Sequence, residues 1–349
     1  MPKKNPNKNN SVTLKEVAAE LGVSAMTVSR AVNNSPNVDS KTKKRILEKA
    51  KKMGYTPNLV AKSLVSSKTY TVGVVIPEIS HSFFPDVVRG IEEVVDSKAY
   101  QILLTNTSDN FEKEKKVIEA LKAKRVDGML ISSSLMTDNF SYYKELIKSG
   151  MPIVFFDRCI ENIGASCIKV NDQAASQQIT EHLINLGYKK IGYLSGPKKV
   201  SIGKARFDGF NIAMIKNGLP VDDKLIIENG YNEKGGYDAM KKLLKLPAKD
   251  RPRAVVAVND PVAFGAMDAI KDANLRIPED IAIVGFTNDI RANLVTPPLT
   301  TVNQPAYELG KKAASKLIDT IQEKGDLVEN VELITNLVVR ESCGSLLYK

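Results

Sequence analysis

The chain has 349 residues, of which 43% are hydrophobic and 26% charged, and its formal net charge is +10. This length exceeds one typical core, so two or three domains are expected. No apolar run reaches the roughly 18 residues that a membrane helix needs, and the basic lead at residues 1–12 lacks the apolar stretch of a secretory signal. The sequence therefore predicts a cytoplasmic protein with no membrane partner and a disordered N-terminal lead.

The net charge is confined to one end of the chain. Residues 1–70 carry 14 Lys and Arg against 4 Asp and Glu, whereas the other 279 residues carry 36 of each kind. Such asymmetry predicts a polyanion as partner, and the phosphate backbone of DNA is the obvious one, because neutralising phosphates releases counterions. The alternative, a basic solubility tail, is disfavoured because this segment has helical patterning.

The cysteines and histidines predict no metal site. The three cysteines, Cys159, Cys167 and Cys343, are odd in number and lack CxxC spacing, so neither a disulfide framework nor a zinc site is indicated. Buried thiols are expected instead. The two histidines, His81 and His182, are too few for a His-rich metal centre, and no cofactor is predicted.

Residues 13–33 predict two short helices around a glycine turn. Thr13 and Glu16 have capping-box spacing, in which a hydroxyl and a carboxylate satisfy each other's backbone N–H groups. Gly22 supplies the turn, and Ser24 is a good N-cap for the second helix. This arrangement predicts a helix-turn-helix within a DNA-binding domain at residues 13–56.

A third helix follows, with Asp39 or Ser40 as its cap and Ile46, Leu47 and Ala50 as its inner face. Its outer face is strongly basic, consisting of Lys41, Lys43, Lys44, Arg45, Lys49, Lys51 and Lys52.

The start of the second helix is the expected DNA-reading element, because this part of a helix-turn-helix meets base edges in the major groove. Arg30 can donate a bidentate pair to guanine, worth ~1–3 kcal/mol of discrimination; a phosphate contact is the alternative. Lys15 is a candidate for a backbone contact. The DNA contacts predicted in this domain are Thr13, Ser24, Ala25, Met26, Thr27, Ser29, Arg30 and Asn33.

Residues 57–69 predict a hinge. Pro57 ends the preceding helix and Asn58 can cap a short new one, which is marginal in water without DNA or a partner copy. Leu64 on this segment is suited to wedge between base steps in the minor groove. A plain flexible linker is the alternative.

The segments TLKEVAAELGVSAMTVSRAVNN, GYTPNLVAKSLVSSKT and TVGVVIP resemble the lac/galactose repressor (LacI/GalR) family of bacterial transcription regulators. The resemblance runs from about Thr13 to Glu341. It implies a homodimer on a pseudo-palindromic operator, most often a repressor, whose hinge helix leads to an effector-binding core. It also implies a wedge role for Leu64. The hinge residues expected to contact DNA are Asn58, Ala61, Lys62 and Leu64.

From residue 70 onward, short β-rich runs alternate with amphipathic segments, which predicts parallel sheets covered by helices. The predicted strands are 71–77, 100–107, 126–133, 152–157, 167–170, 190–196, 225–230, 254–260, 281–286 and 332–341, and the predicted helices include 84–97, 112–124, 173–186, 203–217 and 234–246. Two doubly wound parallel-sheet lobes in an α/β core are expected, and the resemblance implies the periplasmic-binding-protein-like form. The segment TPPLTTVNQP at 296–305 also resembles the family, and the resemblance implies that each lobe is built from two stretches of chain: about 70–170 and 302–331 for the first lobe, and about 171–301 and 332–349 for the second.

Ligands of such folds bind at the carboxyl ends of strands, so a site between the lobes is expected. The strand ends combine aromatic, carboxylate and amide side chains at 77–84, 157–158, 259–260 and 286–289. The resemblance implies contacts to a small effector of the sugar class from Phe83, Phe84, Asp157, Arg206, Tyr231 and Asn259. Ordinary loop or cap roles are the alternative for each.

One motif departs from the family pattern. Many members read GFDD or GYDN where this chain reads GFTND, so Thr287 replaces an acid that commonly contacts the ligand. Asp289 is the candidate to compensate. A hydroxyl is a weaker acceptor than a carboxylate, so this corner of the effector site is expected to differ.

Three other functions are alternatives to an effector-controlled repressor. A global regulator of the same family would take a phosphoprotein corepressor as its signal. A solute-binding protein would share the core but would need a signal peptide and no basic head. An enzyme is disfavoured because no Gly-rich phosphate loop and no HExxH motif occurs.

Overall fold

The computed structural model describes residues 12–56, 68–134, 140–322 and 328–346. The chain forms two compact units, Met1–Thr69 and Tyr70–Lys349, each considered by itself below. The described part of the first unit is the headpiece (residues 12–56), and the second unit is the core. In the described ranges no helix is long and apolar enough to cross a membrane.

The headpiece contains three helices whose ends are set by local capping. They are α1 (Leu14–Leu21), α2 (Ala25–Val32) and α3 (Ser40–Lys52). The predicted capping box of Thr13 and Glu16 is confirmed, as are the left-handed Gly22 after α1 and the Ser24 cap of α2. Asp39 caps α3 by accepting a hydrogen bond from the Thr42 N–H at 2.9 Å.

A small apolar cluster holds the three helices together: Val17, Ala18, Val28, Ala31, Ile46 and Ala50 are all buried. The expectation for Leu47 was wrong, because this side chain is 42% exposed. Ile46 and Ala50, four residues apart, form the inner stripe of α3, and the residue after Ile46 points about 100° away from it.

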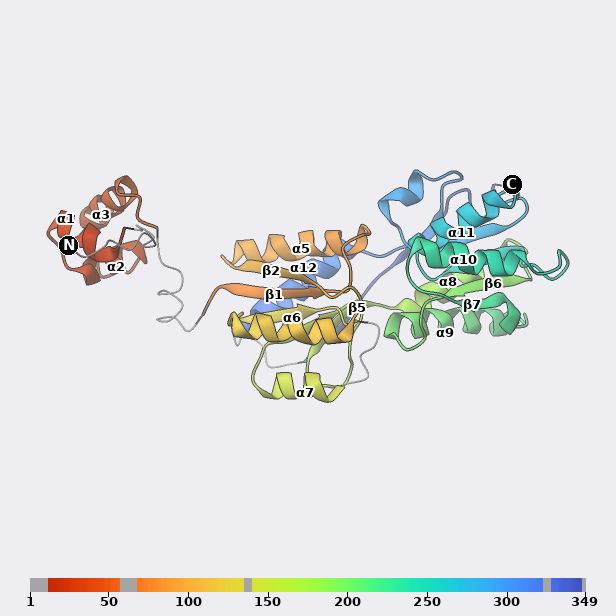
Figure 1. The fold of residues 1–349 in the computed structure, drawn as a ribbon, viewed down its shortest axis with the longest axis horizontal. Helices are drawn as coiled ribbons and strands as arrows, with labels where there is room; N and C mark the ends of the chain where they lie inside the picture. Colours follow the sequence, from red (N-terminus) through yellow and green to blue (C-terminus); the bar gives the residue numbers. More distant parts are fainter. Residues whose placement is uncertain (1–11, 57–67, 135–139, 323–327, 347–349) are drawn as a thin grey trace, which may run out of the picture. The chain divides into compact units, whose positions relative to one another are not determined.

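The first lobe of the core is built on a six-stranded sheet. From edge to edge its strands are β11 (Asn330–Leu333), β5 (Ser166–Val170), β4 (Ile153–Phe156), β3 (Gly128–Ile131), β1 (Thr71–Ile76) and β2 (Gln101–Asn106), all parallel. One face is covered by α5 (Phe83–Ser97) and α12 (Ala306–Ile321), and the other by α6 (Phe111–Ala123) and α7 (Phe140–Lys148) (Figure 1).

The second lobe repeats this plan. Its strands in spatial order are β12 (Asn336–Val338), β10 (Thr300–Asn303), β9 (Ala282–Thr287), β8 (Ala254–Ala257), β6 (Ile191–Ser195) and β7 (Ile226–Glu228). Helices α10 (Glu233–Leu244) and α11 (Asp260–Asp272) cover one face, and α8 (Asp172–Asn185) and α9 (Ser201–Lys216) cover the other. Short 3₁₀ turns occur at Asp223–Leu225 (η1) and Ile290–Asn293 (η2). The two predicted doubly wound lobes are thus present.

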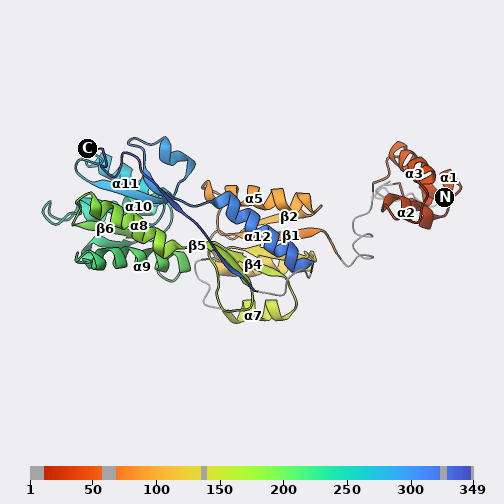
Figure 2. The same cartoon turned by 180° about the vertical axis from the view of Figure 1, so that it is seen from behind.

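The chain crosses between the lobes three times, at residue 171, at residues 304–305 and at residues 334–335 (Figure 2). The prediction of one strand at 332–341 was wrong for this reason. Its first part pairs with β5 in the first lobe, whereas β12 pairs antiparallel with β10 in the second. Apolar residues occur on both sides of Thr335 and Asn336, so the local pattern did not reveal the change of sheet.

The prediction of free cysteine thiols was also wrong in part. Cys159 and Cys167 form a disulfide, with their Cα atoms 5.8 Å apart, and Cys343 is free and buried. Cys159 follows the end of β4, and Cys167 lies in the neighbouring strand β5. Sequence spacing did not indicate this pair because strand pairing brings the two side chains together.

Close contact between α10 and α11 fixes the start of α10. A Cβ atom on Gly265 would lie 1.8 Å from the Glu233 carbonyl oxygen, and one on Gly236 would lie 2.1 Å from the Val262 carbonyl oxygen. Only glycine allows the backbones to approach this closely. The first residue of α10, Glu233, is therefore held against α11.

Candidate functional site

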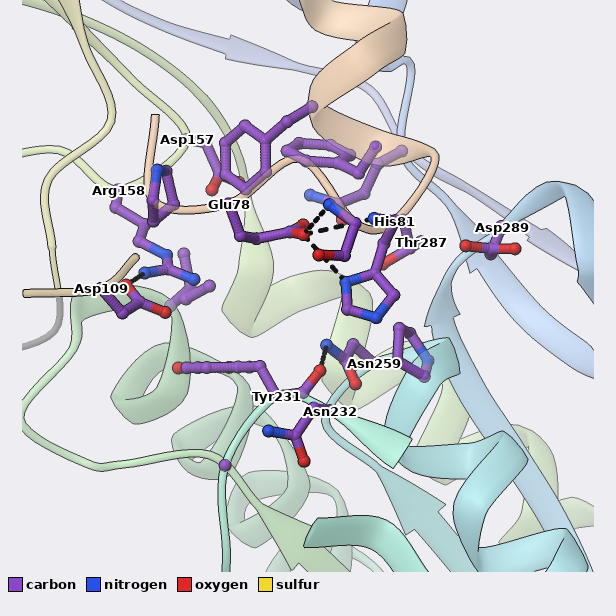
Figure 3. A pocket seen from close by; sticks show the side chains of 18 of the residues that line it. Glu78, His81, Asp109, Asp157, Arg158, Tyr231, Asn232, Asn259, Thr287 and Asp289 are labelled. Atoms are coloured by element: carbon purple, nitrogen blue, oxygen red, sulfur yellow. Dashed lines mark hydrogen bonds and ion pairs between the residues drawn. The ribbon is translucent and has the colours of Figure 1, made fainter. Parts of the chain in front are cut away.

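A cavity of about 440 Å³ lies between the lobes, at the carboxyl ends of strands from both sheets. Figure 3 shows its side chains. All eight predicted effector contacts are among its lining residues: Phe83, Phe84, Asp157, Arg206, Tyr231, Asn259, Thr287 and Asp289. Its size and mixed polarity suit a small-molecule ligand.

The first lobe supplies an aromatic wall. Phe83 and Phe84 begin α5, and their rings meet edge to face with centroids 5.1 Å apart. Phe84 also meets Phe156 of β4 at 6.5 Å and is buried, whereas Phe83 is partly exposed. These contacts fix the orientation of a flat apolar surface at the cavity.

Arg206 lies in the middle of α9 with only 3% of its surface exposed. Its Nε donates to Asp172 Oδ1 at 2.7 Å, and one terminal nitrogen donates to the Val258 carbonyl oxygen at 2.8 Å. The guanidinium also lies 3.8 Å from the centre of the Phe286 ring. The other terminal nitrogen lies 3.5 Å from Gln304 Oε1, so each of the three nitrogens has an acceptor and this side chain organises the cavity floor as well as lining it.

Asp157 follows β4 in a left-handed conformation with φ of 57° and is 5% exposed. Burial raises the pKa of its carboxyl to about 6, although the neighbouring Arg158 and Arg206 lower it. Arg158 forms an ion pair with Asp109, and its guanidinium lies 5.1 Å from the centre of the Tyr231 ring. The cavity therefore holds a buried acceptor beside a cation that is already paired.

Asn259 has a structural role at the cavity. As N-cap of α11, its side-chain oxygen accepts from the Val262 N–H at 3.0 Å, and its amide donates to the Tyr231 carbonyl oxygen at 2.9 Å. This second bond places the 229–232 loop, and with it the Tyr231 ring, against the cavity.

The corner at Thr287 and Asp289 is shaped by contacts within the second lobe. Thr287 ends β9 with φ of 129° and lines the cavity. Asp289 caps η2, and its carboxylate accepts from the Arg291 backbone N–H and from Arg291 Nε, each at 2.9 Å. In Figure 3 Asp289 lies well apart from Asp157 and Arg158. Asp289 is thus committed to Arg291.

Several cavity residues were missing from the predicted contacts, notably Glu78, His81, Asp109 and Gln304. Glu78 and His81 fall within the predicted strand end at 77–84. Asp109 and Gln304 follow β2 and β10, so applying the strand-end rule to every strand would have found them.

Three polar atoms at the cavity have no hydrogen-bond partner among the described residues. They are Arg158 Nε, the Tyr231 hydroxyl and Gln304 Nε2. Buried polar atoms are normally satisfied, so these atoms are available to a ligand or to water. No group of three or more His, Cys, Asp or Glu side chains that could hold a metal ion occurs in the ranges that the structure describes.

The headpiece presents the predicted recognition residues at the start and on the exposed face of α2. Met26 is 63% exposed and Arg30 is exposed, whereas Ala25, Thr27 and Ser29 are partly buried. The Thr13 and Ser24 hydroxyls act as caps, and the Asn33 amide donates to the Ser29 hydroxyl at 3.4 Å. The hinge predictions for Asn58, Ala61, Lys62 and Leu64 lie outside the described residues.

Part of the basic face of α3 is engaged within the headpiece. Lys49 forms an ion pair with Glu20 at 2.7 Å, Arg45 donates to the Leu21 carbonyl oxygen at 3.3 Å, and Lys43 donates to Asn34. Lys41, Lys44, Lys51 and Lys52 have no side-chain partner among the described residues.

Comparison with protein-family models supports both units. Residues 13–58 match the family described as bacterial regulatory proteins, lacI family, and residues 180–343 match a periplasmic binding protein-like domain.

Full-length relatives and solved structures agree with these matches. The chain is 36% identical to catabolite control protein A of Priestia megaterium, over 87% of this chain and 90% of that protein. It is 35% identical to the HTH-type transcriptional regulator RegA of Clostridium saccharobutylicum, over 95% and 99%. A lac repressor dimer bound to operator and the anti-inducer ONPF is similar in structure, with a TM-score of 0.86, 26% identity and coverage of 96% and 99%. A CelR–cellobiose complex has a TM-score of 0.73, 29% identity and coverage of 95% and 99%.

Proposed function

Because the chain belongs to the lacI family of bacterial transcription regulators, we propose that it is a dimeric, cytoplasmic, sequence-specific repressor controlled by a small polyhydroxy effector, a sugar. The effector binds in the cavity between the core lobes. The chain works as a regulator and not as an enzyme, in keeping with the names of its relatives.

The observation that carries the effector proposal is the chemistry of the cavity. The cavity is lined by an aromatic wall at Phe83 and Phe84, by Arg158 and Gln304, which each carry a donor without a partner, and by the buried Asp157. A sugar ring presents an apolar face and hydroxyls that both donate and accept, which this set complements. The CelR–cellobiose complex, to which this chain is similar, supports the same class of ligand.

In the proposed mechanism the effector acts by changing the relative arrangement of the lobes. The three crossings at residues 171, 304–305 and 334–335 are the points at which the lobes pivot. In the dimer a pivot alters the spacing of the two hinge segments, and so their folding on DNA. Coupling of this kind is typically ~1–3 kcal/mol.

A fluorescence-anisotropy titration tests this function directly. The purified protein is titrated onto its own upstream DNA and onto a scrambled duplex, with and without ribose, glucose and cellobiose. Tighter binding to the native site, shifted by one sugar, is the expected result. Equal binding to both duplexes contradicts sequence-specific recognition of that site.

A second candidate function is a global regulator whose signal is a phosphoprotein corepressor. Thr287 favours it, because a hydroxyl stands where the family patterns GFDD and GYDN have a carboxylate. The same titration separates the candidates: a phosphoprotein, and not a sugar, would then shift the binding curve.

Arg30→Ala is expected to reduce the preference for native over scrambled DNA by about 5- to 150-fold, as for loss of a bidentate base contact. Arg30 is exposed on α2 and has no partner among the described residues. Lys52→Ala is the matched control, and it should weaken binding to the native and the scrambled duplex by the same factor. An equal loss on both duplexes for Arg30→Ala would mean that Arg30 contacts phosphate only.

Asp157→Asn is expected to weaken binding of the active sugar by about 10- to 100-fold, because a charged acceptor is lost. In the wild type the sugar affinity should fall as the pH decreases from 6.5 to 5, since Asp157, whose pKa is about 6, becomes protonated. The variant should lack this fall. Asp208→Asn on the outer part of α9 is the control. Unchanged affinity in Asp157→Asn would remove Asp157 from the site.

A further inference from the structure

A charged cluster joins the two lobes at the edge of the cavity. His81 lies in the loop before α5 of the first lobe and lines the cavity, as Figure 3 shows. Its Nδ1 is 3.1 Å from Glu78 Oε2 of the same loop, and its Nε2 is 3.2 Å from Glu233 Oε2 at the start of α10 in the second lobe. The imidazole therefore stands between two carboxylates from opposite lobes.

Both carboxylates are held in place by other bonds. Glu78 Oε2 also accepts from the backbone N–H groups of Ser80 at 2.6 Å and His81 at 3.2 Å. Glu233 Oε1 accepts from Arg291 at 2.8 Å, and Arg291 is bound in turn to Asp289. Neither carboxylate is free to turn away from the imidazole without breaking these contacts.

This geometry requires a proton on His81. A neutral imidazole has one N–H and one lone pair, so it can donate to only one carboxylate, and its lone pair then faces the other. Because Glu78 is fixed to the backbone, the neutral form would keep its proton on Nδ1 and present a lone pair to Glu233. The protonated form donates to both.

The charged groups around His81 agree with this assignment. Among the described residues they are Glu78 on its own loop, Glu233 on α10, and the Arg291–Asp289 pair on η2. The hydrogen bond to Glu78 raises the pKa of His81, and Glu233 raises it further, while partial burial acts in the opposite direction.

We propose that protonated His81 bridges the two core lobes through Glu233, so that proton uptake stabilises this arrangement of the lobes and pH modulates the cavity. A second cross-lobe contact, from the Ile290 N–H to the Ser82 hydroxyl at 3.4 Å, carries no charge and is independent of pH. The link to gene regulation rests on the proposed function, because it assumes that the cavity takes the effector.

The pH range follows from the direction of the shift. The pKa of His81 is raised in the folded protein relative to its value of about 6.5 in the unfolded chain. The stabilisation of the folded protein by protonated His81 is therefore fully present below pH 6.5, and it is lost as the pH rises through the pKa of the folded state. The bridge is therefore lost at a pH above 6.5.

The first measurement is the pKa of His81 by NMR of the full-length protein labelled with ¹³C at histidine. The chain has two histidines, so His81→Gln assigns both signals. Glu233→Gln is expected to lower the pKa of His81, whereas Glu228→Gln, an exposed residue of the same lobe with no contact to His81, should not. A His81 pKa that does not respond to Glu233→Gln overturns the proposal.

The second measurement is a double-mutant cycle of His81→Gln and Glu233→Gln by urea unfolding at pH 6 and pH 9, without DNA or effector. The expected coupling is about two- to fivefold in the unfolding equilibrium constant at pH 6, as for a partly exposed ion pair, and it should be smaller at pH 9. Asp157, Asp260 and Cys343 also titrate in this range, but they are present in all four proteins and cancel.

A purely structural contact would give equal coupling at both pH values, which would overturn the proposal. Because neither measurement uses DNA or effector, failure here leaves the proposed regulator untouched. Conversely, if the DNA titration shows no specific binding, the His81–Glu233 bridge can still be tested by both measurements.

Discussion

Raising the salt concentration from 50 to 200 mM is expected to weaken DNA binding by about 10³- to 10⁵-fold. The physical reason is counterion release, because the excess positive charge of the chain lies in residues 1–70 and the remainder is neutral. This range corresponds to roughly 6–10 phosphate contacts. The measurement is the anisotropy titration repeated at four salt concentrations, with the slope of log K against log salt as the readout.

Two lysines of the headpiece provide a matched pair for this prediction. Lys44 has no side-chain partner among the described residues, so Lys44→Gln should reduce the salt slope by about 1 for each protomer. Lys49 is paired with Glu20, so Lys49→Gln should change the slope less. Binding that is insensitive to salt would refute the assignment of the basic headpiece to phosphate contacts.

Replacing Arg206 by leucine is expected to destabilise the core by about 3–5 kcal/mol, the range for breaking a buried ion pair by removing one partner. Asp172, which is 6% exposed, would keep its charge without its 2.7 Å partner. The Val258 carbonyl oxygen would also lose a donor. Urea unfolding of the wild type and the variant measures this loss.

The loss of stability in Arg206→Leu should also depend on pH. Burial already raises the pKa of Asp172, and removing Arg206 removes the attraction that opposes this shift. As the pH falls, Asp172 in the variant takes up a proton and its unpaired charge disappears, so the loss should be smaller at pH 5 than at pH 8.

Arg276→Leu is the control, because its partner is the surface residue Asp280 and the Arg276 side chain is 70% exposed. For Arg276→Leu the free energy of unfolding should fall by only about 0–1 kcal/mol. If Arg206→Leu costs no more than this control, Arg206 is not the organising residue of the cavity floor.

The features of the fold that depend on neighbouring residues in the sequence were predictable. Thr13, Gly22 and Ser24 set helix ends through bonds within four residues along the chain, and the structure shows each of these caps. The strands and helices from residue 70 onward were predictable because the spacing of apolar residues within each element indicates which of its faces is buried. Their alternation along the chain then predicted parallel sheets.

The parts that depend on pairing between distant segments were not predictable. The stretch 332–341 reads as one strand, yet it supplies β11 to one sheet and β12 to the other. Cys159 and Cys167 meet because β4 and β5 pair, a fact absent from their spacing. At Leu47 the helical pattern was compatible with two inner faces, and packing against α1 and α2 selected Ile46 and Ala50.

The cavity between the lobes shows the same division. The sequence, with the family resemblance, selected eight residues by strand ends and motifs, and all of them line one cavity. It did not show how their hydrogen-bonding groups are used: Asn259 caps α11, Asp289 is held by Arg291, and most of the Arg206 donors are engaged.

The sequence by itself determined that this protein has a basic helix-turn-helix and an α/β core, because charge segregation, capping and hydrophobic period are properties of neighbouring residues. Only the tertiary structure decided which strands share a sheet and that His81 reaches Glu233, 152 residues away. Such contacts arise when whole elements pack, and packing depends on the summed shape of many side chains, which no short window of sequence contains.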